Sequence, residues 1–147
     1  MPDKRTLQRA REDKREGKAP STQAGEFVRE EIHHIREGKH GARSPEQAIA
    51  IGLSKARRAG VNLPPPEKGK SSESTRESAR HALQRRGKKT STKRAKAVRS
   101  ALKHEGHSAA SKPALAKHAR VAAKRRTAAD RSAAARKAAR TRAHAST

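Results

Sequence analysis

Residues 43–60, RSPEQAIAIGLSKARRAG, contain the clearest helix start and stop in the chain. Ser44 has the side chain that an N-cap requires, and Pro45 suits the first helical position, where no amide hydrogen is needed. Gln47 stands three residues after the cap and can complete a capping box. Gly60 is placed to end the helix in a left-handed conformation. The sequence therefore predicts one well-delimited helix between Ser44 and Gly60.

A second amphipathic segment precedes this helix and ends at Gly38. Its apolar residues recur at steps of three and four, which places them on one face of a helix. The two segments predict an αα-hairpin over 21–63, with helices at about 24–37 and 45–59. Small residues at Ala48, Gly52 and Ala56 would allow the two helices to approach closely. We expect the hairpin core to consist of Phe27, Val28, Ile32, Ile35, Ile49, Leu53, Val61 and Leu63.

The rest of the composition argues against a large core. The chain has 38 Lys and Arg against 14 Asp and Glu, a net charge of +24. Leu, Ile, Val and Phe number only 15 of 147 residues, and such chains are typically disordered. We therefore predict a mostly disordered protein with α-helical parts and no β-structure. Because ordering the hairpin costs more than its few apolar side chains return, we expect it to form a homodimer or to dock on a protein partner.

Charge and composition divide the chain into four segments. Residues 1–20 form a polar nascent helix, 21–63 the hairpin, 64–78 a linker that begins with three prolines, and 79–147 a basic tail of short, conditional helices. The charge is concentrated at the C-terminal end: residues 1–69 hold 15 basic and 10 acidic residues, whereas 70–147 hold 23 and 4. We infer that the two halves have different functions.

The tail contains an internal repeat. Residues 79–87 (ARHALQRRG) align with 98–106 (VRSALKHEG) at an offset of 19, and a weaker third copy begins at Arg120. Each copy is a short basic segment with high helix propensity and a narrow stripe of small residues. Repulsion between neighbouring charges opposes folding, and bound phosphates would remove it.

The basic tail predicts binding to a polyanion, because each phosphate contact releases condensed counterions. Phe27 is the single aromatic residue, so stacking of bases on aromatic platforms is nearly excluded. We expect binding without sequence preference, to DNA in preference to RNA, in the cytoplasm and specifically the bacterial nucleoid. The residues expected to contact phosphates are Arg80, Arg85, Arg86, Lys88, Lys89, Lys93, Arg94, Lys96, Arg99, Lys103, Lys117, Arg120, Lys124, Arg125, Arg126, Arg131, Arg136, Lys137, Arg140 and Arg142.

Three alternatives remain open at this point. The partner could be structured RNA, such as ribosomal RNA. The hairpin could be a protein-interaction adaptor, with the basic tail serving only for solubility. Residues 24–60 could also form a helix-turn-helix that presents Lys55, Arg57 and Arg58 to a groove, although such domains normally have a third helix.

Enzymatic and metal chemistry find little support in the sequence. There is no cysteine, no nucleophile elbow and no Gly-rich phosphate loop, so we expect no catalytic residue and no cofactor. His33, His34 and His40 with Glu30 and Glu37 are the one candidate metal group, and we interpret them as a solvated polar face without a metal. No segment is apolar enough to span a membrane, and we expect no secretion signal.

Two resemblances add to this interpretation. The run from Gln47 to Ala59 resembles the core of a family of short, basic, uncharacterised bacterial proteins that share the pattern Q-A-I-A-I-x-L-S-x-A-R-x-A. This resemblance covers about 40 residues with the preceding helix, and it implies a bacterial domain of no established activity. The tail is similar in composition to the Lys- and Ala-rich tails of histone H1 and of bacterial H1-like proteins, which implies DNA binding.

Overall fold

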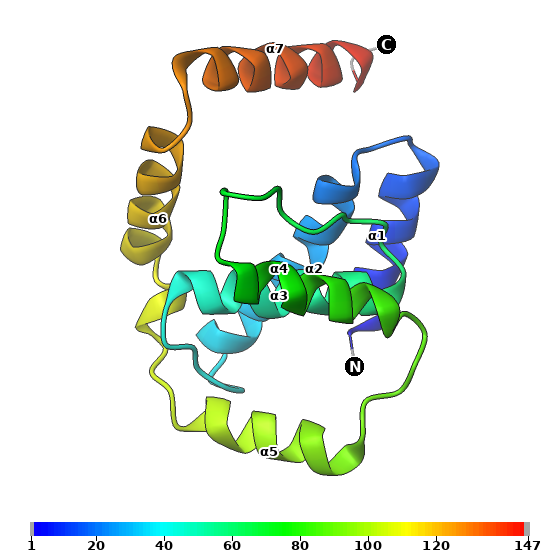
Figure 1. The fold of residues 1–147 in the computed structure, drawn as a ribbon, viewed down its shortest axis with the longest axis vertical. Coiled ribbons are helices and arrows are strands. Elements are labelled where there is room, and N and C mark those ends of the chain that lie inside the picture. The colour runs from blue at the N-terminus through cyan, green and yellow to red at the C-terminus, as the bar shows by residue number, and fades with distance from the viewer. Residues whose placement is uncertain (1, 146–147) are drawn as a thin grey trace. The chain divides into compact units, whose positions relative to one another are not determined.

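A computed structural model describes residues 2–145, and this part of the chain is all-α (Figure 1). It divides into two compact units, residues 1–111 and 112–147. The first unit contains α1 (Lys4–Arg15), α2 (Pro20–Arg36), α3 (Pro45–Ala59), α4 (Glu73–Gln84), α5 (Thr92–Lys103) and the short 3-10 helix η1 (Ser108–Ala110). The second contains α6 (Lys112–Lys124) and α7 (Ala128–Ala145).

The prediction of a mostly disordered chain is therefore wrong, whereas the prediction of helices without strands is confirmed for residues 2–145. The scarcity of large apolar residues does not prevent this chain from folding. Alanine, lysine and arginine are strong helix formers, and alanine allows helices to pack closely without a bulky core. Helix also extends into both segments that we expected to be nascent or conditional.

The predicted hairpin is present as α2 and α3, and its start signals operate as expected. The Ser44 hydroxyl accepts a hydrogen bond from the Gln47 amide at 3.2 Å. The Gln47 side chain accepts one in return from the Arg43 amide at 2.6 Å, one residue before the cap. Gly60 ends α3 with a φ of 109°, a conformation that glycine adopts without strain.

The main core of the first unit joins three helices. Ala10 of α1 and Ala24 and Phe27 of α2 are buried with Ala56 and Val61, and Leu7, Leu53 and Leu63 pack around them. The polar N-terminal segment is thus a formed helix that packs on α2. Of the eight residues expected in the hairpin core, Phe27, Ile32, Ile35 and Val61 are buried, and Val28, Ile49, Leu53 and Leu63 are half-buried.

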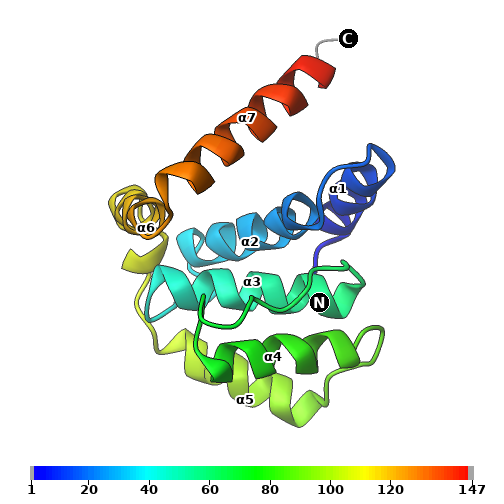
Figure 2. The same cartoon turned by 45° about the horizontal axis from the view of Figure 1, so that its top comes forward.

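Helix α3 lies between α2 and α4 (Figure 2). Ala79 and Ala82 of α4 are buried, and α4 packs against α3. The expected linker over 64–78 thus becomes helical from Glu73. Helix η1 contacts both α2 and α3, and its carbonyl at Ala110 accepts a hydrogen bond from Arg36 at 2.8 Å.

The 19-residue repeat corresponds to α4 and α5. Each is 12 residues long, and each is capped by a serine side chain, Ser72 and Ser91, at equivalent positions. The loops that follow them contact the hairpin in different places. The Gly87 amide donates to the Arg58 carbonyl at 3.0 Å, and the Gly106 carbonyl accepts from Ala42 at 2.9 Å. Each repeat therefore attaches to the hairpin through its terminal glycine.

Gly41→Ala should strongly destabilise the protein, because Gly41 packs directly against the backbone of the loop after α5. The Gly41 amide donates to the Leu102 carbonyl at 2.8 Å, and a Cβ at Gly41 would lie 2.0 Å from the Glu105 carbonyl oxygen. Because the clash is with backbone, both inter-segment hydrogen bonds should be lost, which lowers the free energy of unfolding by about 2 kcal/mol. Urea titration measures this change.

Gly106→Ala is the matched control, since a Cβ at Gly106 meets no atom within 4 Å. It alters the same loop contact from the other side and should leave the urea midpoint nearly unchanged. Equal midpoints for the two variants would show that the α5 loop is not held against Gly41.

Candidate nucleic-acid interface

Every one of the twenty lysines and arginines expected to contact phosphates is exposed. They are distributed over the helices α4, α5, α6 and α7, the loop between α4 and α5, and the turn after α6. Residues 70–147 contain only four acidic residues against 23 basic ones. One of these acids, Glu73, forms ion pairs with Arg76 at 2.7 Å and Arg80 at 3.6 Å. The remaining positive charge cannot be neutralised within this half of the chain.

Helix α5 has a basic face. Lys96, Arg99 and Lys103 stand at positions i, i+3 and i+7, which lie within about 60° of one another on a helix of ~100° per residue. We call these three residues the α5 triad. Leu102 and Val98 lie beside this face, about 60° and about 100° from Arg99 around the helix, and Val98 is 52% exposed.

Helix α6 repeats this arrangement. Lys117, Arg120 and Lys124 have the same i, i+3, i+7 spacing and form the α6 triad. Leu115 and His118 are half-buried on the other side of the helix. Both triads are visible in the sequence through this spacing, and their residues are among the twenty expected contacts, where they were not distinguished as faces.

Helix α4 differs from α5 at these positions. In the 19-residue alignment, Glu77 and Gln84 of α4 take the places of Lys96 and Lys103. Helix α4 packs on α3, whereas α5 has no residue buried. The first repeat thus contributes to the core, and the second presents charge.

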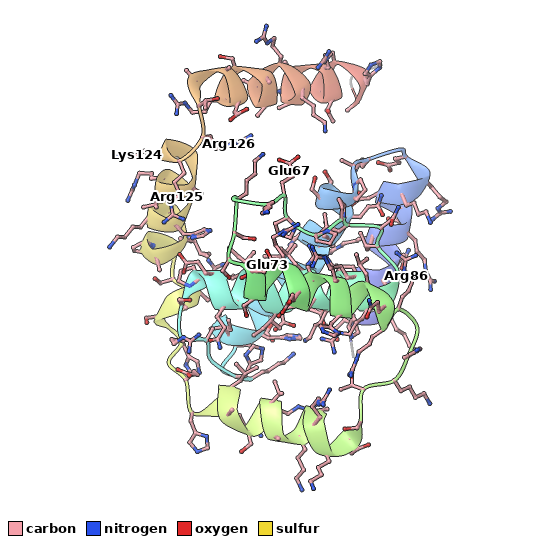
Figure 3. The ribbon with its side chains drawn as sticks, in the orientation of Figure 1. Glu67, Glu73, Arg86, Lys124, Arg125 and Arg126 are labelled. Carbon is pink, nitrogen blue, oxygen red and sulfur yellow. The ribbon has the colours of Figure 1, made fainter. Side chains whose placement is uncertain are left out.

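The turn between α6 and α7 is fixed by local hydrogen bonds. Thr127 and Asp130 cap the start of α7 reciprocally, with distances of 3.3 and 3.1 Å. Arg131 donates to the carbonyls of Ala123 at 3.3 Å and Arg126 at 2.7 Å. Figure 3 shows the basic side chains of Lys124, Arg125 and Arg126 projecting from this turn. Asp130 therefore serves as a helix cap in a segment otherwise rich in positive charge.

The helix-turn-helix alternative loses its proposed contacts. Arg57 is buried and donates to the carbonyls of Leu63 at 3.1 Å and Pro64 at 3.2 Å, and this burial lowers the pKa of its guanidinium. Lys55 pairs with Glu31. Arg58 donates to the Thr90 hydroxyl at 3.1 Å. All three cations therefore make contacts within the first unit, and the buried Arg57 is not available to a groove.

Comparison with known proteins gives a partial match. Residues 13–68 match the profile of a family of unknown function, DUF6496. That segment includes α2, α3 and the loop between them, and it ends before α4. No curated protein and no solved structure matches the chain. Across residues 2–145, no helix has the length and apolar character needed to cross a membrane.

Proposed function

We propose that this protein binds nucleic acid through phosphate contacts, without sequence preference, and that it compacts DNA in the bacterial nucleoid. The observation that carries the proposal is the exposure of all twenty expected phosphate contacts on helices and loops that hold only four acids. Such a surface raises the local concentration of phosphate and gains free energy from counterion release.

Duplex DNA is favoured over single-stranded RNA by the position of the one aromatic side chain. Phe27 is 1% exposed in the hairpin core, so it cannot stack on a base. A base-stacking platform is the usual device for reading single strands. Contacts from helix faces to phosphates suit a duplex.

The physical reason for expecting a homodimer is weaker in the folded chain. Helices α1 and α4 and η1 pack on the hairpin, so the chain itself supplies packing that we had assigned to a second copy or a partner. The adaptor alternative requires an uncovered apolar face on the hairpin. Val98 and Val121, the large exposed apolar residues, lie on α5 and α6 instead.

The salt dependence of binding tests the proposal. If about ten phosphates are contacted, the logarithm of the association constant for duplex DNA should fall with the logarithm of salt concentration at a slope of about −9. Fluorescence anisotropy with labelled duplexes of two unrelated sequences measures the slope and should give equal affinities. A slope shallower than about −3 contradicts the proposal.

Competition with ribosomal RNA at physiological salt distinguishes the two nucleic acids. We expect unlabelled duplex DNA to displace the labelled duplex at lower nucleotide concentration than folded ribosomal RNA does. The reverse order would favour structured RNA as the partner.

A further inference from the structure

Acidic and imidazole side chains lie close together where α2 and the loop after it pack near Asp3, just before α1. Glu30, Glu31 and His34 lie on one side of α2, His40 lies in the loop before α3, and Asp3 precedes α1. We call these five residues the Glu–His cluster. The side chains of Glu31 and Glu30 are 1% and 4% exposed, and those of His40 and His34 are 12% and 15% exposed.

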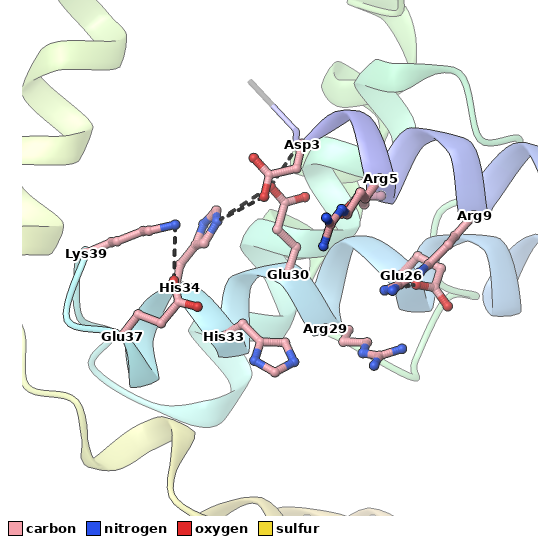
Figure 4. Close-up of a pocket in the computed structure, with 11 residues that line it drawn as sticks. Asp3, Arg5, Arg9, Glu26, Arg29, Glu30, His33, His34, Glu37 and Lys39 are labelled. Carbon is pink, nitrogen blue, oxygen red and sulfur yellow. Dashed lines mark hydrogen bonds and ion pairs between the residues drawn. The ribbon is translucent and has the colours of Figure 1, made fainter.

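This arrangement differs from the solvated face that we expected for the histidines. Glu30 is buried, and His40 returns to α2 after the turn at Gly38. His33 and Glu37 are exposed and lie outside the cluster. Figure 4 shows Asp3, Glu30 and His34 converging.

The donor atoms of the cluster are close to one another. His40 Nε2 lies 3.1 Å from Glu31 Oε2. His34 Nε2 lies 3.7 Å from Glu30 Oε1 and 3.8 Å from Asp3 Oδ2. One potential ligand atom from each of Glu31, His34 and His40 lies within 4.8 Å of the others, and the same holds for Asp3, Glu30 and His34. His34 therefore belongs to both groups.

The hydrogen bond of His40 fixes which of its nitrogens faces the cluster. Nδ1 lies 2.9 Å from the Gly41 carbonyl oxygen, and a carbonyl can only accept, so Nδ1 carries a hydrogen. Nε2 then presents to Glu31 either a second proton or a lone pair. A metal-binding histidine usually donates one ring N–H to a backbone carbonyl or a carboxylate, which leaves the other nitrogen for the metal.

The carboxylates of the cluster are incompletely satisfied. Lys55 pairs with Glu31 Oε1, and the Asp3 amide donates to Glu30 Oε1 at 2.9 Å. Among the described residues, Glu30 Oε2 is buried and has no hydrogen-bond partner, and Glu31 Oε2 is buried with the His40 Nε2 atom 3.1 Å away. Buried polar atoms without partners are costly and few in native proteins. A metal ion bound here would supply the partner that Glu30 Oε2 lacks.

A cavity gives access to one side of the cluster. It has a volume of about 230 Å³, and Asp3, Glu30 and His34 line it. Its outer residues include Arg9, which pairs with Glu26 at 3.7 Å, and Lys39, which pairs with Glu37 at 3.1 Å. Arg9 and Lys39 are thus paired with acids outside the cluster, and Arg5 and Arg29 also line the cavity.

We propose that Glu31, His34 and His40 bind a divalent transition-metal ion of the Zn²⁺ type, with Glu30 or Asp3 as a further ligand. Two imidazoles and carboxylates, without sulfur, suit Zn²⁺, Co²⁺ or Ni²⁺ better than Mg²⁺, which prefers oxygen ligands. Bonds of about 2.1 Å place tetrahedral donors about 3.4 Å apart, so donors within 4.8 Å reach that geometry by small side-chain movements.

The ion would connect three parts of the first unit. It would join α2 to the loop that carries His40. It would also reach the segment before α1, either through Asp3 directly or through Glu30, which accepts a hydrogen bond from the Asp3 amide. The loop residues Gly41 and Ala42 in turn bond the end of α5. Metal binding should therefore raise the thermal stability of the first unit as a whole.

Titration calorimetry of the full chain tests the site. After dialysis against a chelator, ZnCl₂ should bind with one ion per chain, and MgCl₂ should not bind. His40→Ala and His34→Ala should each weaken Zn²⁺ binding by tenfold or more. His33→Ala is the matched control, because His33 neighbours His34 on α2 but is exposed, and it should bind as the unchanged chain does.

Two further measurements keep the outcome clear if a variant folds poorly. Co²⁺ added to the unchanged chain should give the visible absorption bands of a tetrahedral site with nitrogen ligands, and Zn²⁺ should displace them. The melting temperature of the unchanged chain should rise with Zn²⁺ and fall back on chelation. Absence of saturable Zn²⁺ binding, or equal weakening by His33→Ala and His40→Ala, would overturn the proposal.

Discussion

Gly52→Ala should lower the free energy of unfolding by about 2 kcal/mol, although alanine is by far the better helix former. A Cβ at Gly52 would lie 2.6 Å from Val28 Cα and 2.8 Å from the Val28 amide nitrogen. Because these are backbone atoms of α2, no rotamer change relieves the clash, and α2 and α3 must move apart. Their separation loosens the packing around Phe27 and Ala56 that forms the core.

Gly25→Ala provides the matched control on the opposing helix. Gly25 is exposed within α2, and a Cβ there meets no atom within 4 Å. The same exchange should therefore raise the free energy of unfolding by about 0.5–1 kcal/mol, the usual gain in helix propensity. Urea unfolding of the two variants gives both values. A Gly52→Ala variant as stable as Gly25→Ala would mean that the helices do not approach closely at this position.

The hairpin could be predicted because its signals are local. Ser44, Pro45 and Gly60 set the two ends of the helix in which they lie. The apolar stripe of α2 needs only a second helix with an apolar face of the same periodicity. The expectation that Gly52 allows close approach also rests on the sequence alone, and the distance to Val28 confirms it. Such features follow from residues a few positions apart.

The extent of folding could not be predicted in the same way. Among residues 2–145, nine of the thirteen buried hydrophobic residues are alanines. A count of Leu, Ile, Val and Phe leaves these residues out. Alanine buries little area, but it brings helices together where their backbones nearly touch. Whether Ala10 or Ala110 is buried depends on where distant segments lie, and no local pattern of the sequence determines this.

The Glu–His cluster shows the same limit. Glu31 stands within the apolar stripe of α2, four residues after Phe27 and four before Ile35, so its burial follows from helical periodicity. Only the path of the loop after Gly38 places His40 beside it. The basic triads are different, because their spacing of i, i+3 and i+7 is visible in the sequence. The basic helix faces could therefore be predicted from helical periodicity, whereas the contacts of the buried charges depend on long-range packing.

Neutralising a triad should have the largest effect on nucleic-acid binding. Replacing the α5 triad with glutamine removes three phosphate contacts, so the salt slope for duplex DNA should become shallower by about 2.7, at about 0.9 per contact. At about 0.1 M salt this corresponds to a loss of affinity of a few hundredfold. Replacing the α6 triad with glutamine should change the salt slope and the affinity by the same amounts. Anisotropy titrations over a range of salt concentrations measure both quantities.

The matched control removes three charges from another exposed surface. Arg11, Lys14 and Arg15 of α1 are exposed, but Glu12, Asp13 and Glu16 stand among them, so phosphates should gain little there. Their replacement with glutamine should change the slope by less than about 1. An equal loss in this control would mean that total charge alone determines binding. A triad loss that depends on DNA sequence would instead indicate contacts to bases, because a phosphate contact carries no sequence information. Equal losses for the two triads, with little loss in the control, are what phosphate neutralisation by two helix faces requires.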